Sequence, residues 1–303
     1  MENRLNKDIK LGLIGISEGN GHPYSWSSIF NGYDRELMEK CGFPIIPRYL
    51  EKQNFPEDQI LGAKVTHIWT QNTSLSEKIA KTTNIENIIS DPKKFIGSVD
   101  AVLLARDDAE ISREMAHPIL EAGIPIYIDK PLALTVNGAK KLISMQKYEG
   151  QIFSCSALRY DSNLRLTEDQ QKTVGQICSI HATVSKDWDK YAVHVIEPLL
   201  QLIPNRGALL KSQKWISNDQ TSLFIEYENK INVHIHTSGK SISPLSLRVI
   251  GVNGWTDLFH NDTFKAFKIA LQEFILAIKN KEVRIPSQQT LDVVELIELG
   301  RKI

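Results

Sequence analysis

Residues 99–130, VDAVLLARDDAEISREMAHPILEAGIPIYIDK, read as a strand, a helix and a second strand in immediate succession. VDAVLLA (99–105) and IPIYID (124–129) are short, nearly continuous apolar runs. Between them, AEISREMAHPILEAG has apolar residues at helical spacing and stops at Gly123, a residue type that commonly follows a helix end. Apolar strands joined by a helix predict a parallel sheet that is covered on both faces.

The same alternation extends toward the N-terminus. IKLGLIGI (9–16) and AKVTHIWT (63–70) are further strand candidates, and SLSEKIAKTTN after the second predicts a helix with Ser74 as its N-cap. The first half therefore predicts an α/β fold with a doubly wound parallel sheet. Right-handed crossovers place the carboxyl ends of all these strands at one edge, where ligands bind, and Lys130 lies at that edge.

The second half of the chain has a different pattern. Three strand candidates, GALLKSQKWIS, TSLFIEYE and KINVHIHTS, follow one another closely, and LSLRVIGVNGWTDLF predicts a hairpin that turns at Asn253-Gly254. Two helical stretches, FKAFKIALQEFILAIKN and QQTLDVVELIELGRK, end the chain. We therefore expect a C-terminal α+β domain with one large, mostly antiparallel sheet, and domains of residues 1–130 and 131–303.

Bulk composition narrows the classes of function. A chain of 303 residues suits two domains, and its 36 basic and 36 acidic residues create no overall field for nucleic acid or an anionic membrane. The N-terminus lacks the apolar region of a signal peptide and no run is long enough to span a membrane, which predicts a cytoplasmic protein. Cys41, Cys155 and Cys178 are odd in number and widely spaced, so we expect reduced thiols in the core.

The turn after the first strand, in GLIGISEGNGHPYSWSSIF, is rich in glycine. A dinucleotide fingerprint requires glycines at positions 15, 17 and 20, but here two of them are displaced to Gly19 and Gly21. The turn still joins a strand to a helix, so its amides could hold a pyrophosphate; a tight turn without a ligand is the alternative. The residues of this turn expected to contact a cofactor are Gly15, Ser17, Gly19, Asn20, Gly21 and His22.

Two other strand ends carry candidate cofactor contacts. The end of the second strand, WTQNTS, has neither the acid that reads an NAD ribose nor the arginine that reads an NADP phosphate. Thr70 and Gln71 could bind either group without selecting between them. Arg106 is expected to meet a cofactor phosphate or a substrate anion, or to form a surface ion pair with Asp107 and Asp108. The sequence leaves open the role of an ordered insertion over residues 33–62.

The segment from residue 99 to 135 resembles the glucose-fructose oxidoreductase, inositol dehydrogenase and rhizopine-catabolism (Gfo/Idh/MocA) oxidoreductase family. That family carries Glu-Lys-Pro-Leu-Ala after a strand, where this chain has Asp129-Lys130-Pro131-Leu132-Ala133. SALRYD (156–161) resembles the family's aromatic-Arg segment on the first strand of the second domain, and residues 264–282 resemble its penultimate helix. The resemblance implies a Rossmann-type dinucleotide-binding domain, a second domain for substrate binding and oligomerisation, and NAD or NADP as cofactor.

The resemblance also implies catalytic residues. The family's lysine reaches the reacting hydroxyl, which makes Lys130 the predicted catalytic ammonium, and Pro131 biases it toward extended backbone geometry. The family's second motif, Asp-x-Gly-x-His, matches DKYAVHVIEP, where His194 falls on the proton-exchanging histidine and Lys190 and Ala192 replace the aspartate and glycine. Asp129 and Lys130 are also expected to lie near the cofactor. The predicted substrate contacts are Arg159, Tyr160, Lys190, Tyr191 and His194.

These features predict an NAD(P)-dependent oxidoreductase of carbohydrate metabolism, which moves hydride to or from a hydroxyl or keto carbon of a sugar, cyclitol or sugar derivative. The displaced glycines and altered second motif leave a non-catalytic nucleotide- or sugar-binding protein on the same scaffold as the alternative. The resemblance implies a homodimer or homotetramer formed through the second sheet. HIH at 234–236 has no third ligand at a metal-like spacing, so no metal is expected.

Overall fold

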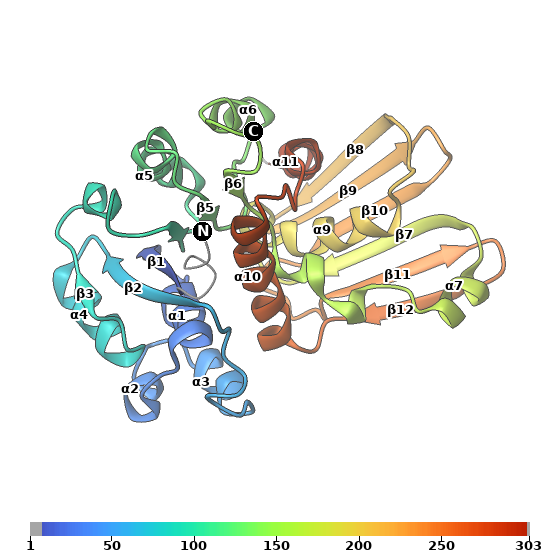
Figure 1. Cartoon of the computed structure of the whole chain (residues 1–303). Helices are drawn as coiled ribbons and strands as arrows, with labels where there is room; N and C mark the ends of the chain where they lie inside the picture. Colours follow the sequence, from blue (N-terminus) through green and yellow to red (C-terminus); the bar gives the residue numbers. More distant parts are fainter. Residues whose placement is uncertain (1–7, 302–303) are drawn as a thin grey trace. The chain divides into compact units, whose positions relative to one another are not determined.

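The computed structural model describes residues 8–301, which form two compact units (Figure 1). Unit 1 takes the chain up to residue 132, residues 140–154 and residues 267–287, and unit 2 takes residues 133–139, 155–266 and the chain from residue 288. The chain first passes from unit 1 to unit 2 between Leu132 and Ala133. Among the described residues, three helices have residues in both units, namely α6 (Val136–Ile143), α10 (Thr263–Asn280) and α11 (Ser287–Gly300).

Unit 1 is built on a six-stranded sheet in the order β3-β2-β1-β4-β5-β6. All neighbouring strands pair in parallel, which confirms the predicted doubly wound sheet. The two outermost strands have two residues each and were not predicted, because such short strands show no periodicity. The strands are β1 (Ile9–Ile14), β2 (Ala63–Trp69), β3 (Asn87–Ile88), β4 (Ala101–Leu104), β5 (Ile126–Ile128) and β6 (Ile152–Phe153).

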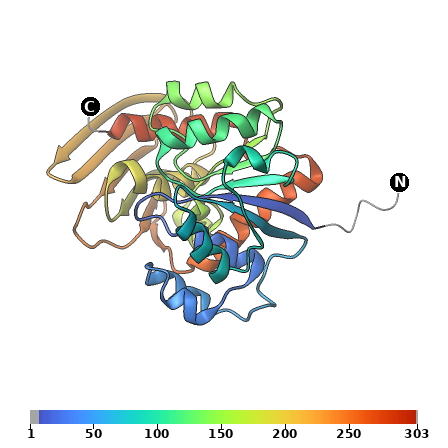
Figure 2. The ribbon, with the colours of Figure 1, turned by 90° about the vertical axis from the view of Figure 1, so that its left-hand side faces the viewer.

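Helices cover both faces of this sheet, and Figure 2 shows the strands between α1 on one side and α5 on the other. Trp26 of α1 packs on Tyr127 of β5 with ring centroids 4.8 Å apart. Gly123 has a positive φ of 74° just after α5, which confirms its predicted place at the helix end. The helices here are α1 (His22–Asn31), α4 (Thr73–Thr82), α5 (Ala109–Glu121) and the 3₁₀ turn η1 (Pro92–Phe95).

The predicted cap of α4 is wrong by two residues. Asn72 is the N-cap, and its side chain accepts a hydrogen bond from the backbone of Leu75. Ser74 lies inside the first turn instead, since Asn72 has the extended backbone geometry that a cap requires.

The insertion at residues 33–62 packs against both α1 and α4. It contains two short helices, α2 (Arg35–Glu39) and α3 (Ile45–Leu50). The Tyr49 hydroxyl donates to Ser25 of α1 at 2.5 Å, and the backbone N–H of Ile60 donates to Ile29 at 2.9 Å. The insertion therefore supports the helix that follows the glycine-rich turn.

Unit 2 is built on a second six-stranded sheet in the order β12-β11-β7-β10-β9-β8. Only β7 and β10 pair in parallel, so the sheet is mostly antiparallel, as predicted. The hairpin at Asn253-Gly254 is confirmed by the hydrogen bond from Gly251 to Gly254. The strands are β7 (Ile177–Val184), β8 (Leu209–Ser217), β9 (Gln220–Tyr227), β10 (Asn232–Thr237), β11 (Ser246–Gly251) and β12 (Trp255–Phe259).

Helices pack on one face of this second sheet, and Figure 1 shows α9 lying across it. The apolar side chains of α9 that are buried include Val195, Ile196 and Leu199. The opposite face carries alternate strand residues that remain at least partly accessible. The helices are α7 (Glu168–Val174), α8 (Trp188–Tyr191), α9 (Val193–Leu202) and α11 (Ser287–Gly300), and the 3₁₀ turns are η2 (Ala157–Tyr160) and η3 (Ser162–Leu164).

Two local predictions about this part of the chain are wrong. The SALRYD segment forms 3₁₀ turns rather than a strand, because the Ser156 and Asp161 side chains cap successive turns there. Cys178 is exposed, since it falls on an outward position of β7, whereas Cys41 and Cys155 are buried. All three are free thiols.

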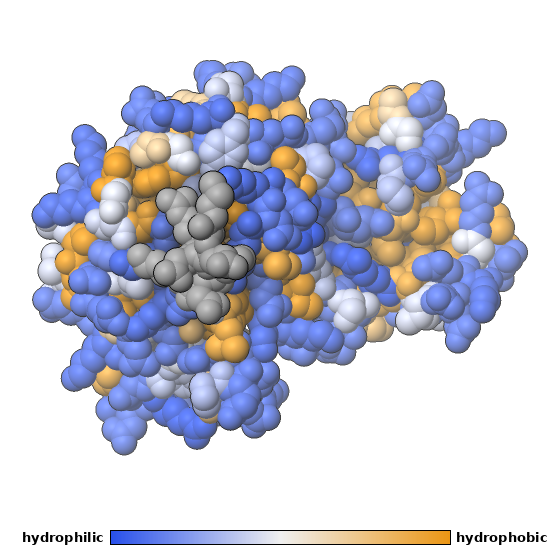
Figure 3. Space-filling model, viewed as in Figure 1, coloured by the Kyte–Doolittle hydropathy of each residue, from blue (hydrophilic) through white to orange (hydrophobic). Residues whose placement is uncertain are grey.

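The face of the molecule seen in Figure 3 is mainly hydrophilic, with hydrophobic residues gathered in patches. Over residues 8–301, none of the helices combines the length and the apolar character that crossing a bilayer requires.

Candidate active site

The candidate site of unit 1 lies where β1, β2, β4 and β5 end. Lys130 follows β5 and is only 5% exposed. Its ammonium nitrogen lies 3.7 Å from Oδ2 of Asp107, which follows β4. Ser17, in the glycine-rich turn after β1, donates to Oδ1 of the same aspartate at 2.6 Å. Asp107 therefore connects the turn to the predicted catalytic lysine.

A second aspartate ties the same turn to β5. Asn20 donates from Nδ2 to Oδ2 of Asp129 at 2.8 Å, and Nδ1 of His22 lies 2.5 Å from the same oxygen. Burial acts to raise the pKa of Asp129, but the charges of His22 and Lys130 and the hydrogen bonds from His22 and Asn20 hold that pKa well below its ordinary value. Asp129 is therefore an ionised carboxylate inside unit 1.

The three glycines of the turn have different roles. A Cβ on Gly15 would lie 2.6 Å from Pro23, and one on Gly21 would lie 2.6 Å from Ile46, so these two glycines allow close packing. Gly19 has a φ of +77°, and a Cβ there would meet no heavy atom within 4 Å. Within residues 8–301 the N–H groups of Glu18, Gly19 and Gly21 have no hydrogen-bond acceptor. The turn thus presents open backbone donors at Gly19.

The polar groups after β2 are engaged within unit 1. Gln71 accepts from the backbone N–H of Ile16 at 3.2 Å and donates to its carbonyl at 2.8 Å. Arg106 donates to Gln71 at 3.1 Å and from Nε to Asp108 at 2.9 Å. The Thr70 hydroxyl donates to the backbone of Asn72 at 2.6 Å.

Arg106 forms an ion pair with Asp108. It is not on the surface, because Arg106 is 5% exposed. Its other acidic neighbour, Asp107, interacts with Ser17 and Lys130 instead. Sequence reasoning treated Asp107 only as a loop charge. Its position directly after a parallel strand was the signal that could have placed it in the site.

Unit 2 holds the predicted substrate residues. Arg159 of η2 donates to Glu197 of α9 at 3.0 Å and also bonds Gln289 of α11, and both members of the ion pair are buried. Nδ1 of His194 lies 2.8 Å from the Ser156 hydroxyl.

The other predicted substrate residues lie around α8. The Lys186 ammonium lies over the Tyr191 ring, 4.2 Å from the ring centroid. The backbone N–H of Lys190 donates to the side chain of Asp187, the N-cap of α8. Tyr160 ends η2, one residue after Arg159. Each of these residues is therefore held within unit 2, and their roles toward a substrate stay predictions.

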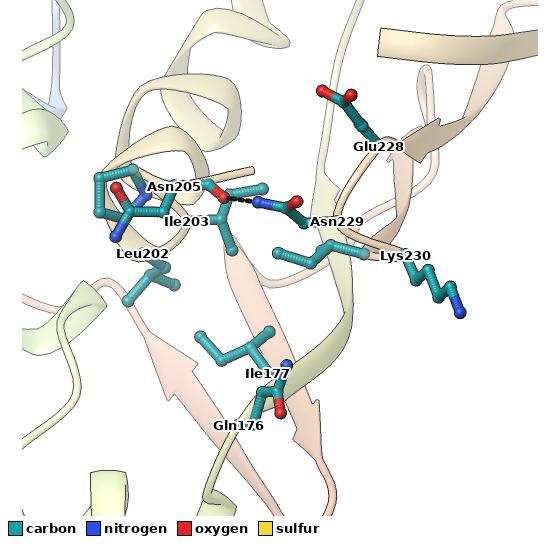
Figure 4. Close-up of a pocket in the computed structure, with 10 residues that line it drawn as sticks. Gln176, Ile177, Leu202, Ile203, Asn205, Glu228, Asn229 and Lys230 are labelled. Carbon is teal, nitrogen blue, oxygen red and sulfur yellow. Dashed lines mark hydrogen bonds between the residues drawn. The ribbon is translucent and has the colours of Figure 1, made fainter. Parts of the chain in front are cut away.

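A separate pocket of about 570 Å³ opens in unit 2 near the starts of β7 and β10 (Figure 4). The Asn229 side chain reaches the backbone carbonyl of Asn205 across it. None of the predicted site residues lines it. Its lining residues are Gln176, Ile177, Leu202, Ile203, Pro204, Asn205, Glu228, Asn229, Lys230 and Ile231.

Within the described residues 8–301, no three His, Cys, Asp or Glu side chains are grouped so that they could hold a metal ion. His234 and His236 project from β10, with ring centroids 6.3 Å apart.

Comparison with known proteins gives one family match. Residues 42–156 match the Gfo/Idh/MocA family, described as an oxidoreductase family with an NAD-binding Rossmann fold. Among proteins of curated function, none matches the chain in sequence.

Solved structures resemble the fold over almost the whole chain. The myo-inositol dehydrogenase of Lactobacillus casei, solved with NAD(H) and myo-inositol, is 13% identical, with a TM-score of 0.73 over 97% of this chain and 93% of that one. The myo-inositol 2-dehydrogenase of Lactobacillus plantarum is 14% identical, with a TM-score of 0.71 over 96% of each chain. A UDP-N-acetylglucosamine 3-dehydrogenase of Acidithiobacillus ferrooxidans is 13% identical, with a TM-score of 0.69 over 96% of this chain and 95% of that one.

Proposed function

Because residues 42–156 match the Gfo/Idh/MocA oxidoreductase family, we propose that the chain is a member of it and an NAD(P)-dependent oxidoreductase acting on a hydroxyl or keto carbon of a sugar, cyclitol or sugar derivative. The observation that carries this proposal is the buried Lys130 ammonium at the carboxyl end of β5, 3.7 Å from Asp107. The substrate class comes from the inositol and UDP-sugar dehydrogenases that share the fold.

The glycine-rich turn fits a dinucleotide. Its glycines, although displaced, meet the two requirements of the fingerprint. Gly15 and Gly21 allow close packing, and Gly19 leaves the backbone accessible to a ligand. The N–H groups of Glu18, Gly19 and Gly21, at the start of α1, would hold the pyrophosphate. A bound nicotinamide would supply the hydride acceptor or donor. The residues that would contact the cofactor ribose are not assigned, because the Gln71 side chain already bonds the backbone of Ile16.

Lys130 acts on the substrate oxygen. Its ammonium donates a hydrogen bond to the hydroxyl or carbonyl oxygen and stabilises the negative charge that develops there. Asp107 and Ser17 hold the lysine and the turn together, so that the donor is oriented before substrate binds. The family motif makes His194 of unit 2 one candidate for the accompanying proton transfer.

Cofactor binding tests the proposal through Gly19. We expect Gly19→Ala to raise the Kd for NADH at least tenfold, about 1.4 kcal/mol, because a methyl group would stand where the backbone must approach the pyrophosphate. Gly97→Ala is the matched control, since Gly97 also has a positive φ, +81°, and an open Cβ position, but lies before β4 at the other edge of the sheet. Titration by nicotinamide fluorescence measures both. If the wild-type chain binds neither NADH nor NADPH, the result favours the non-catalytic alternative over the oxidoreductase.

We also propose that the open face of the unit 2 sheet forms a homodimer or homotetramer. Side chains from all six strands stand in one row there, namely Gln213, Phe224, His234, His181, Arg248 and Asp257. Phe224 is 48% exposed, and Trp215 and Trp255 on the same sheet are 68% and 59% exposed. A twofold axis over such a face would let it pack against its own copy.

Light scattering tests this assembly. We expect Phe224→Glu to weaken association by about 2 kcal/mol or more, because it places a charge at an aromatic contact. Ile45→Glu in unit 1, where Ile45 is 62% exposed, should leave the molecular mass unchanged. A wild-type monomer at working concentration would count against the assembly.

A further inference from the structure

His22 is the first residue of α1 and is held from several sides. Its ring stacks on Trp26 with centroids 5.0 Å apart and 13° between the planes, and Phe267 meets it edge-on, also at 5.0 Å. Its backbone N–H donates to the Asn20 side chain at 2.9 Å, and its side chain is 17% exposed. The imidazole therefore has one fixed orientation but remains accessible.

Asp129 fixes which ring nitrogen carries hydrogen. An ionised carboxylate only accepts hydrogen bonds, so Nδ1 of His22, 2.5 Å from Oδ2, must be the donor. This holds for the neutral and the protonated ring alike, and proton exchange is left to Nε2. Within residues 8–301, Nε2 has no hydrogen-bond partner.

The position of this pair is as informative as its geometry. His22 follows the glycine-rich turn, and Asp129 directly precedes Lys130, whose backbone N–H donates to Oδ1 of Asp129 at 2.8 Å. The same carboxylate thus orients the imidazole and the loop that carries the catalytic ammonium. By contrast, the Ser156 hydroxyl that meets Nδ1 of His194 can donate or accept, so that bond leaves the tautomer of His194 undetermined.

We propose that His22 is a catalytic acid–base residue whose Nε2 exchanges a proton with the reacting hydroxyl, and that Asp129 is its positioning residue. The proposal rests on the proposed function. During oxidation of a secondary alcohol, the carbon–hydrogen bond breaks and its hydride passes to an oxidised nicotinamide. The hydroxyl proton passes to Nε2, the carbon–oxygen bond becomes a carbonyl, and the imidazolium later releases its proton to water.

Nitrogen NMR on the full chain tests the geometry without turnover. In ¹⁵N-labelled protein, with the His22 signals assigned by their loss in His22→Gln, we expect a protonated Nδ1 and an unprotonated Nε2 in the neutral ring. Asp129→Asn should abolish this preference. Adding NADH with myo-inositol should shift the Nε2 signal. A ring protonated at Nε2, or an Nε2 signal that ignores both ligands, would overturn the proposal.

Kinetics on a panel of myo-inositol, scyllo-inositol and UDP-N-acetylglucosamine tests the role. We expect His22→Gln to lower kcat/KM by about 10²–10⁴-fold and to remove the acidic limb of the pH profile. His117→Gln on α5, whose side chain is 49% exposed, is the control for losing a histidine. A full loss in His194→Gln with an active His22→Gln enzyme would assign the proton to His194 and overturn the proposal.

The two failures are distinguishable. If the wild-type chain oxidises none of the panel and binds no NADH, the proposed function fails, whatever the His22 tautomer. If it binds NADH and turns over a substrate while His22→Gln keeps wild-type kcat/KM, only the role of His22 fails.

Discussion

Lys130→Met is expected to lower kcat by about 10²–10³-fold, the effect of removing one preorganised donor from a developing negative charge. Methionine keeps the unbranched apolar stem and removes only the ammonium. Because the backbone donors assigned to the pyrophosphate lie in the glycine-rich turn, cofactor affinity should change little. Reduction of NAD or NADP in the presence of the substrate panel measures kcat, and fluorescence titration measures affinity.

Two further variants sharpen this test. Lys93→Met in η1, an exposed lysine outside the site, should retain full turnover. Lys130→Arg keeps the positive charge but replaces a compact ammonium by a planar fork, so its kcat should stay low. A fully active Lys130→Met enzyme would refute the assignment of Lys130.

The second large effect concerns stability. Asp129→Asn should lower the free energy of unfolding at neutral pH by about 3–5 kcal/mol, because it removes the charge that Asn20, His22 and Lys130 compensate in a buried position. Guanidinium unfolding followed by tryptophan fluorescence measures the difference. Asp169→Asn, where the side chain is 96% exposed, should cost less than about 1 kcal/mol.

The same residue predicts a pH dependence. The pKa of Asp129 is lower in the folded chain than in the unfolded one, where it is about 3.9. Its contribution is therefore complete above that unfolded pKa and is lost as the pH falls toward the folded one. The difference between wild type and Asp129→Asn should thus be constant near neutral pH and shrink below about pH 4. A constant difference down to pH 2 would contradict the role of the charge.

Elements with strong periodicity were predictable from the sequence. The strands that begin at Ile9 and Ala63 are rich in apolar residues, and the strand that begins at Ala101 is continuously apolar. The helix between β4 and β5 has a clear apolar stripe and is followed by Gly123. Local signals failed where competing caps lay close together, as at Ser74 and Asn72. They also failed where a strand had only two residues, as at β6.

The candidate site was predictable in its position but not in its contacts. Topology placed Lys130, the glycine-rich turn and Arg106 at the same edge, because parallel strands share a carboxyl end. The ion pair of Arg106 with Asp108 was predicted, but the bonds from Arg106 to Gln71 and from Gln71 to Ile16 were not, since each joins residues brought near only by the packing of neighbouring strands.

By itself, the sequence determined the parallel and the mostly antiparallel sheets, and the delivery of Lys130 to a ligand-binding edge, since these follow from local apolar patterns and chain order. Only the tertiary structure decided that Asp129 would orient His22 and Asn20. These two residues are separated from Asp129 by 107 and 109 positions in the sequence, respectively. Hydrogen bonds over such distances along the chain depend on the packing of α1 against β5, and no local pattern encodes that packing.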